Sequence, residues 1–480
     1  MKKNKLFSAL VMAFILTAIV VVPAFASNGS LHYIPELTRR NIILVFTPFV
    51  LIVTIAVYFL SGARKGEEKG LWRTAIVFSL LCAVGIGMIW YMVSKSSPDE
   101  NVPDYYRLMT PVKAGGACEK IDLKAVATEP SVDSPIHVRS IDSQADVNCM
   151  EQEQNTLAVD AKTEAPVYIP TGVFIQSMEF TSANNVVVTG YIWQRYSKDV
   201  PADIGHGFIL PEGDSDIYYT EDNVSYRKEQ GDEVVLGWYI NTALRQTFDY
   251  SHYPFDRQDV WLRLWHLNFD RNVILTPDLK AYGAVNDWPQ EPNIFLGLER
   301  DFVLERLSLE RTYFNYHYNN YNVDFGIDNY VGQTAYPELY FNVGVRREVL
   351  DAFVAYMIPM IILVLMSFGV QFIDTQIPDK MSMHGISTTG LIAYYASLFF
   401  IGILAQLDIR RTLNAPGVVY IEYFYFALYI ILLLQTINSV IFAASDSVGF
   451  LEYEDNLYPK VIFFPITLGL MFAITAFLFY

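Results

Sequence analysis

The chain has 480 residues, of which 52% are apolar and 15% aromatic, while only 18% are charged. This composition is too apolar for an ordinary soluble domain and predicts membrane spans. Acidic residues outnumber basic ones by 51 to 34, so the net charge is −17, which excludes nucleic acid as a partner. The 3 cysteines exclude a disulfide-built scaffold and a CxxC metal site, and whether Cys118 and Cys149 are joined stays open.

Residues 1–26 are typical of a secretory signal peptide. Lysines come first, followed by an apolar run and by the small-x-small site Ala24-Phe25-Ala26. An uncleaved anchor is the alternative. Either one predicts that the following segment is exported from the cytoplasm.

Residues 27–93 contain two apolar runs, over 42–60 and 72–93, each close to the roughly 20 residues that cross a bilayer as a helix. The connector between them carries four basic residues, which favours the cytoplasmic side. We therefore predict an N-terminal transmembrane hairpin. It is expected to pack against the outside of a helix bundle, with modulation of that bundle as the alternative.

The polar segment 94–165 has no sustained apolar period, and we expect a linker or a small irregular cap there. From 166 to 347 the pattern changes to short runs rich in Val, Ile, Tyr, Phe and Trp, separated by turn residues. Such spacing predicts an antiparallel β-sandwich. The clearest expected strands cover 167–178, 185–196, 233–239, 259–267 and 338–345.

Residues 348–480 contain four apolar segments, over 350–373, 385–404, 418–444 and 461–480, and predict a four-helix membrane domain. Residues 405–416 are expected to form an outer loop. Arg410 and Arg411 in this loop disagree with the tendency of basic residues to stay inside. We give more weight to the export signal and the basic hairpin connector, which together predict a bacterial inner-membrane protein with its sandwich in the periplasm.

The hexapeptide Tyr253-Pro254-Phe255-Asp256-Arg257-Gln258, in a sandwich followed by four spans, is similar to the signature loop of the pentameric ligand-gated ion channels, the Cys-loop receptor superfamily. Gln246 and Val260 stand where animal members have the two cysteines that flank this loop. Prokaryotic members usually lack that pair too, so the sequence resembles the prokaryotic branch.

Other segments extend the resemblance to about 166–480. Gly172 to Glu179 and Tyr191 to Tyr196 resemble the family's first two strands, and Val323-Asp-Phe-Gly326 with Tyr336 to Arg347 resembles the ninth and tenth strands. Pro359, twelve residues after Arg347, is similar to a proline of the first pore-domain helix. The hairpin and linker before residue 166 depart from the usual family pattern.

The resemblance implies that the hexapeptide loop couples the sandwich to the membrane helices. An aromatic residue before Pro254 suits a cis peptide, and Phe255 at the loop tip needs an apolar receiver, for which the helices are the obvious choice. Asp256 is expected to pair with Arg347, with Glu179 as a second acid. An ordinary hairpin turn with surface charges is the alternative. The expected coupling residues are Glu179, Tyr253, Pro254, Phe255, Asp256, Arg347 and Pro359.

The resemblance also implies a ligand site between neighbouring subunits, rich in aromatic residues that suit amine or amphipathic ligands through cation–π contact. Packing of the same aromatic residues in the sandwich core is the alternative. The candidates are Trp193, Trp265, His266, Phe269, Tyr316, Tyr318 and Tyr321. Three acids, Glu212, Asp214 and Asp216, stand together in one turn, but they lack the spacing of a calcium loop, so a solvated turn is favoured and no metal site is predicted.

The second of the four closing spans is expected to line a pore. Thr389, Ile392, Ala396, Phe399 and Ile403 share one helical face, and Thr388, Leu391 and Tyr395 form a rival face. A hydroxyl ring below apolar rings suits selection by partial dehydration and gating by dewetting. The candidate pore residues are Asp379, Lys380, Ser387, Thr388, Thr389, Ile392, Ala396 and Phe399.

No catalytic motif stands in a suitable context, so neither an enzyme nor a cofactor is predicted. We expect a homopentameric ligand-gated channel that binds membrane lipid, inorganic ions and an unidentified small molecule. The acidic sandwich favours cations over anions. The alternative function is a non-conducting membrane receptor that senses a periplasmic ligand.

Overall fold

The structure is a computed structural model that describes residues 68–95, 108–109, 137–141, 143–161, 164–214, 218–282, 295–319, 321–328, 330, 336–377, 387–415, 417–444 and 455–479. The chain divides into two compact units, each described by itself below. The first unit comprises Met1–Tyr91, Phe368–Tyr394 and Ile430–Tyr480, and the second comprises Met92–Ser367 and Tyr395–Tyr429. The expected signal peptide and the first helix of the expected hairpin lie outside the described residues.

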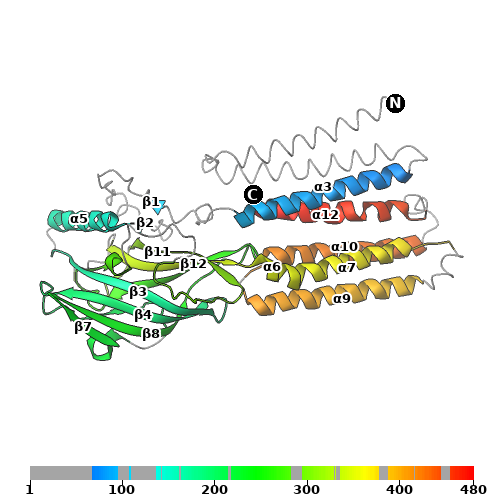
Figure 1. The fold of residues 1–480 in the computed structure, drawn as a ribbon. Coiled ribbons are helices and arrows are strands. Elements are labelled where there is room, and N and C mark those ends of the chain that lie inside the picture. Colours follow the sequence, from blue (N-terminus) through cyan, green and yellow to red (C-terminus); the bar gives the residue numbers. More distant parts are fainter. Residues whose placement is uncertain are drawn as a thin grey trace, which may run out of the picture. The chain divides into compact units, whose positions relative to one another are not determined.

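Two β-sheets form most of the second unit (Figure 1). A seven-stranded sheet has the order β1-β2-β11-β12-β9-β5-β6, and a five-stranded sheet has the order β10-β3-β4-β8-β7. The first sheet contains β1 (Leu108–Met109), β2 (His137–Ile141), β5 (Gly207–Ile209), β6 (Tyr219–Thr220), β9 (Arg257–His266), β11 (Leu307–Asn319) and β12 (Tyr336–Arg347). The second contains β3 (Val167–Phe180), β4 (Asn185–Ser197), β7 (Tyr226–Gln230), β8 (Glu233–Arg245) and β10 (Val273–Pro277).

The five strands expected most clearly from the sequence are all present. Burial alternates residue by residue along β4 and β9, as a strand with one face against a core requires. The long neighbouring strands are antiparallel, but β10 runs parallel to β3 and β1 runs parallel to β2. The expected antiparallel arrangement therefore holds for the long neighbouring strands and not for these two edge pairs.

Side chains join the two sheets at the core. The Tyr316 hydroxyl on β11 donates to the Leu275 carbonyl on β10 at 2.9 Å, and the Tyr336 hydroxyl on β12 donates to the Val273 carbonyl at 2.5 Å. Trp238 is fully buried. The two sheets are therefore compatible with the expected sandwich.

The segment expected to be an irregular linker contains regular structure. Helix α5 (Gln144–Ala161) follows β2, and β2 pairs with β11 from Ile141 to His137. The helix is tied to β3 by the Tyr168 hydroxyl, which donates to the Glu151 carbonyl at 2.9 Å. Cys149 on α5 is disulfide-bonded and Cys82 is free, while Cys118 lies outside the described residues. The sheet domain therefore begins before the predicted boundary at 166.

The prediction that Val323 to Gly326 belongs to a strand is also wrong. These residues lie in the connection between β11 and β12. The Asp324 carboxylate accepts a hydrogen bond from the Gly326 amide at 2.8 Å, and Phe325 and Gly326 both have positive φ, which forms a turn. The strand that pairs with β12 is β11, which starts at Leu307.

Five helices among the described residues are long and apolar enough to cross a membrane, which indicates a membrane protein. They are α3 (Glu68–Lys95), the stretch Val349–Ile373, α9 (Thr388–Leu413), α10 (Tyr420–Ala444) and α12 (Leu457–Phe479). The second stretch consists of α6 (Val349–Ala352), a π-helical turn (Phe353–Met357) and α7 (Ile358–Ile373). Pro359 follows the π-helical turn, where the wider turn accommodates a residue without an amide proton.

Helix α9 is longer than expected and includes most of the predicted outer loop. Beyond the apolar run, Ile409 is fully buried. This burial favours continuation of the helix through the polar residues that follow the run. It ends at Leu413, where Asn414 has a φ of 47° and its amide donates to the Arg410 carbonyl at 2.9 Å. Arg410 and Arg411 are therefore helical residues.

Candidate functional site

The connection between β8 and β9 forms the loop that carries the predicted signature. Its Tyr253-Pro254 peptide is cis, as predicted from the aromatic residue before the proline. Asp256 at its end is 3% exposed, and Arg347 at the end of β12 reaches it. Arg347 Nε donates to Asp256 Oδ1 at 2.9 Å, and a terminal guanidinium nitrogen donates to Oδ2 at 3.0 Å. The predicted fork-shaped pair is confirmed.

Neighbouring groups hold this pair in one geometry. The Gln258 amide donates to Asp256 Oδ2 at 3.1 Å, and the Arg347 backbone amide donates to the Asp256 carbonyl at 3.3 Å. The Arg347 guanidinium lies 4.9 Å from the centre of the Tyr253 ring, within cation–π range. Burial raises the pKa of Tyr253, so its phenol stays neutral beside the ion pair.

The same loop contacts residues at the starts of two membrane helices within the second unit. The Tyr253 ring centre lies 6.4 Å from that of Tyr356 in the π-helical turn, and the Phe255 ring centre lies 6.2 Å from that of Tyr420. The Tyr420 amide, at the first residue of α10, donates to the Ser251 carbonyl at 2.8 Å. The expected apolar receiver of Phe255 is thus an aromatic residue of α10.

The second acid predicted for this junction is not part of it. Glu179 is exposed near the end of β3 and makes no ion pair with any residue that the structure describes. A hydrogen bond instead links the connection after β3 to the signature region, because the Tyr250 hydroxyl donates to the Ala183 carbonyl at 3.1 Å. Pro359 lies past the residues that contact the loop.

Sequence reasoning missed a buried acid between α9 and α10. The Glu422 side chain is 2% exposed, and Arg410 Nε lies 2.7 Å from its Oε1. Gln406 donates to the same oxygen at 3.1 Å, and the Val419 amide donates to Oε2 at 3.0 Å. This network fixes the connection between the two helices directly beside Tyr420.

The predicted ligand-binding residues fall into three groups in the structure. Trp265, Phe269 and Tyr321 come together: the Trp265 ring centre lies 5.6 Å from that of Phe269 and 5.7 Å from that of Tyr321. Phe325 and Tyr330, from the connection between β11 and β12, complete an aromatic cluster around Phe269. Sequence reasoning missed both: Phe325 lay in the segment taken for a strand, and Tyr330 lay in the unassigned stretch after it.

The second group is buried. His266, Tyr316 and Tyr318 are 2%, 0% and 2% exposed, so their side chains belong to the sheet core rather than to a ligand surface. Burial lowers the pKa of His266 to about 4, with His206 nearby adding to the shift, so the imidazole is neutral near neutral pH.

The third group is Trp193 alone, on the five-stranded sheet. Its indole nitrogen donates to Asp278 Oδ2 at 2.8 Å, and Arg195 Nε donates to the same oxygen at 2.6 Å. The Trp193 ring centre lies 5.5 Å from that of Tyr282. These contacts fix the ring plane and leave it partly exposed.

Arg263 contacts the aromatic cluster through the Trp265 ring. The Arg263 guanidinium lies 5.2 Å from the centre of the Trp265 ring, forms an ion pair with Glu212, and lies 3.6 Å from Glu338. The Tyr321 hydroxyl donates to Glu338 at 2.5 Å. Burial raises the pKa of both glutamates, and Arg263 opposes that shift. The cluster therefore already holds a cation of its own.

The surroundings of this cluster are tightly packed. A cavity of about 20 Å³ lies among Trp265, Phe269, Tyr330 and Glu338, which is room for about one water molecule. Glu212 of the acidic turn is occupied by Arg263, and Asp216 lies outside the described residues. No group of three or more His, Cys, Asp or Glu is placed to hold a metal ion in the part of the chain that the structure describes.

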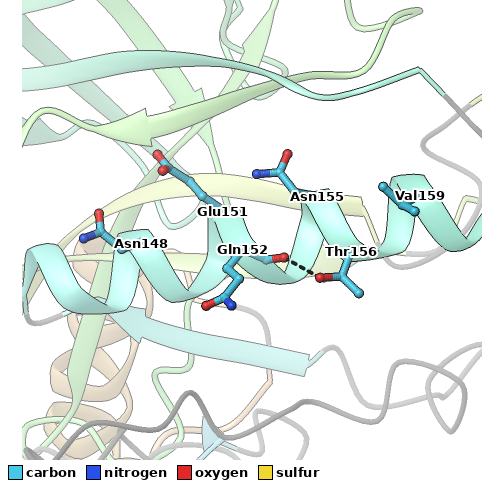
Figure 2. Close-up of a pocket in the computed structure, with 6 residues that line it drawn as sticks. All are labelled: Asn148, Glu151, Gln152, Asn155, Thr156 and Val159. Carbon is cyan, nitrogen blue, oxygen red and sulfur yellow. Dashed lines mark hydrogen bonds between the residues drawn. The ribbon is translucent and has the colours of Figure 1, made fainter.

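A second hollow lies along α5, and Figure 2 shows the side chains that line it. All of them come from one side of this single helix, from Asn148 to Val159. Most end in amide or hydroxyl groups, and the Thr156 hydroxyl donates to the Gln152 carbonyl at 2.8 Å within the helix. Among the described residues, the hollow is lined by α5 alone, and a group from another element, the Tyr168 hydroxyl of β3, donates to Asn155 Oδ1 at 3.3 Å.

Burial along α9 separates the two faces proposed for the pore. Leu391 and Tyr395 of the rival face are 4% and 1% exposed, so that face packs within the chain. Thr389 and Ala396 are exposed, whereas the Phe399 ring lies 5.0 Å from that of Tyr429 on α10. Phe399 is nevertheless 39% exposed and Phe400 is 61% exposed, so the exposed side of α9 includes both. Asp379 and Lys380 lie outside the described residues.

A scan against models of protein families and a search of curated proteins both find no match to this chain.

Proposed function

We propose that this protein is a homopentameric ligand-gated ion channel of the bacterial inner membrane, with a β-sandwich in the periplasm and a pore lined by α9. The observation that carries the proposal is the junction within the second unit. There the loop with the cis proline contacts both the π-helical turn and the start of α10, and the Asp256–Arg347 pair fixes that loop to the end of β12.

Gating follows from the arrangement of these contacts. Arg347 ends β12, and α6 begins two residues later, so any shift of the strand end reaches the first membrane helix. The same shift reaches α10 through Phe255 and the hydrogen bond from Tyr420 to Ser251. A ligand that prefers one position of the strand end thereby biases a closed–open equilibrium.

The ligand is proposed to bind at the aromatic cluster of Trp265, Phe269 and Tyr321, opposite Trp193 of the neighbouring subunit. The cation–π position over Trp265 is already taken by Arg263. A simple amine would have to displace that arginine and its pairing with two glutamates. We therefore favour an amphipathic ligand that packs on the ring edges of the cluster over a simple amine.

Ion flow is proposed to follow the open face of α9. Thr389 supplies a hydroxyl ring and Ala396 and Phe400 supply apolar rings on that face. Such a sequence selects ions by partial dehydration and closes by dewetting. The excess of acidic residues in the chain favours cations.

Recording from the purified protein in planar bilayers with symmetrical potassium chloride tests the proposal. Two variants each remove one hydroxyl: Thr389→Val on the open face and Tyr395→Phe on the buried face. We expect unitary currents that Thr389→Val reduces to about half and Tyr395→Phe leaves unchanged. Silence of the wild type across pH, divalent ions and candidate ligands would favour a non-conducting receptor. An effect of Tyr395→Phe alone would place the pore on the other face.

A further inference from the structure

Helix α3 precedes the sheet domain and packs on α12 within the first unit. Leu71 and Ala75 form a buried cluster with Leu457 and Val461 of α12. Further along, the Phe78 ring faces Gly469 at ordinary contact distance from the position that a Cβ would take. The contact therefore runs along several turns of both helices.

At Gly85 this contact leaves no room for a side chain. A Cβ atom at Gly85 would lie 2.6 Å from the Phe472 ring, closer than real Cβ atoms approach. Membrane helices use small residues in this way to approach a partner closely. Gly87, two residues later, faces open space, with no atom within 4 Å of the position of its missing Cβ. The two glycines are therefore a natural pair for testing the contact.

The carboxyl end of α3 belongs to the second unit and contacts β12. A terminal nitrogen of Arg346 donates to the Ser94 carbonyl at 3.3 Å. Ser94 lies in the last turn of α3, at the negative end of the helix dipole. A guanidinium group is a favourable partner for such an end.

Arg346 stands beside the pair at the junction. It directly precedes Arg347, and its register partner on β9 is Arg257, which directly follows Asp256. Arg346 Nε lies 3.6 Å from Glu310, and Arg257 Nε donates to the same Glu310 oxygen at 3.1 Å. A second, parallel set of charges therefore links the two strand ends and reaches the end of α3.

We infer that α3 is a built-in regulatory element that acts on the junction through Arg346. It is one continuous helix whose first part is anchored on α12 and whose last turn holds the strand end next to the Asp256–Arg347 pair. Displacing α3 removes one of the supports of that strand end and loosens the junction. The effect on gating rests on the proposed channel function, but the effect on the junction does not.

Hydrogen exchange of the full chain in lipid nanodiscs tests the inference without any ligand. The variant Gly85→Val forces a branched side chain against Phe472, and Gly87→Val makes the same change in open space. We expect Gly85→Val to raise exchange in α3 and, by about fivefold or more, in the peptides that cover residues 251–258 and 343–348. Gly87→Val should leave both peptides at the wild-type rate. If, in Gly85→Val, either these two peptides or α3 itself exchanged at the wild-type rate, the inference would be overturned.

A second variant tests the contact at the strand end without disturbing helix packing. The Arg346 side chain is 41% exposed, so Arg346→Gln is compatible with folding. We expect it to raise exchange in the same two peptides while α3 residues 71–85 exchange at the wild-type rate. Exchange at the wild-type rate in both peptides would refute a role for Arg346.

Bilayer recording of the same variants separates this inference from the proposed function. If the wild type conducts, Gly85→Val should change the spontaneous open probability by about threefold or more relative to Gly87→Val. A conducting wild type with equal open probability in the two variants overturns regulation by α3 and leaves the channel intact. A silent wild type overturns the channel function, and the exchange result then still decides whether α3 supports the junction.

Discussion

The strongest expected perturbation is Asp256→Asn, which keeps the size of the side chain and removes its charge. The Asp256 side chain is 1% exposed and the Arg347 side chain 16% exposed, so the substitution leaves a largely buried guanidinium without its counter-charge. Breaking a buried pair in this way costs about 3–5 kcal/mol, and we take about 3 kcal/mol because Arg347 keeps some contact with water.

Hydrogen exchange at the Arg347 amide measures this cost locally, because that amide donates to the Asp256 carbonyl. A loss of about 3 kcal/mol corresponds to roughly a hundredfold faster exchange through local opening. The matched control is Glu179→Gln, which changes an exposed acid without an ion pair among the described residues and should shift exchange by no more than about twofold.

The double variant Asp256→Asn with Arg347→Gln isolates the pairing itself. Because both charges are then absent, its cost should be clearly smaller than the sum of the two single costs. Strict additivity, or an increase of less than about tenfold in Asp256→Asn alone, would refute the assignment of Asp256 and Arg347 as the stabilising pair of the junction.

Three further outcomes are expected. Burial, assisted by Arg263, lowers the pKa of His317 from its ordinary value of 6.5 to about 3. Below pH 6.5 the folded protein therefore binds fewer protons than the unfolded chain, so stability falls as the pH is lowered. Between about pH 7 and about pH 5 the wild type should therefore lose about 2 kcal/mol more than His317→Phe in thermal unfolding of the sheet domain, and parallel curves would contradict this. Glu422→Gln should cost about 2 kcal/mol because it removes the charge of a buried side chain that pairs with Arg410, whereas Asp408→Asn on the exposed side of α9 should be neutral in the same unfolding assay. Gly172→Ala places a Cβ 2.1 Å from the Trp193 ring and should cost about 1–3 kcal/mol with a shift in tryptophan fluorescence, so an unshifted spectrum would count against this packing.

The sequence predicted the elements whose signal is local. The alternation of apolar and polar residues predicted β4 and β9 to within a few residues of their observed bounds. Long apolar runs predicted the membrane helices. The pairing of Asp256 with Arg347 was also predicted, although 91 residues separate them, because the hexapeptide resembles a family in which such a junction occurs.

Elements that depend on tertiary contacts were missed. Helix α5 buries only a narrow stripe through Val147, Met150 and Ala158, so its sequence is too polar to show an apolar period. The two-residue strand β1 and the five-residue strand β2 exist because the edge of β11 offers them hydrogen-bonding partners. No local pattern distinguishes such strands from a linker.

The candidate site was predicted only in part for the same reason. Aromatic residues at the ends of strands were recognised, but alternation alone did not separate the buried Tyr316 and Tyr318 from the cluster around Trp265. Arg263 and Trp265 are two residues apart on β9 and therefore share one face of the strand, which places the guanidinium over the ring. This spacing was visible in the sequence but was not used to predict the contact. Glu422 pairs with Arg410 only because α9 extends beyond its apolar run.

We propose that several copies of this chain surround a water-filled path lined by α9. An electron cryomicroscopy map of the protein in lipid nanodiscs measures this most directly. We expect five subunits around one axis, with Thr389 and Phe400 facing that axis and the loop from Ser251 to Asp256 against the helix ends. A monomer, or an assembly in which α9 faces lipid and no axial path exists, would contradict the account.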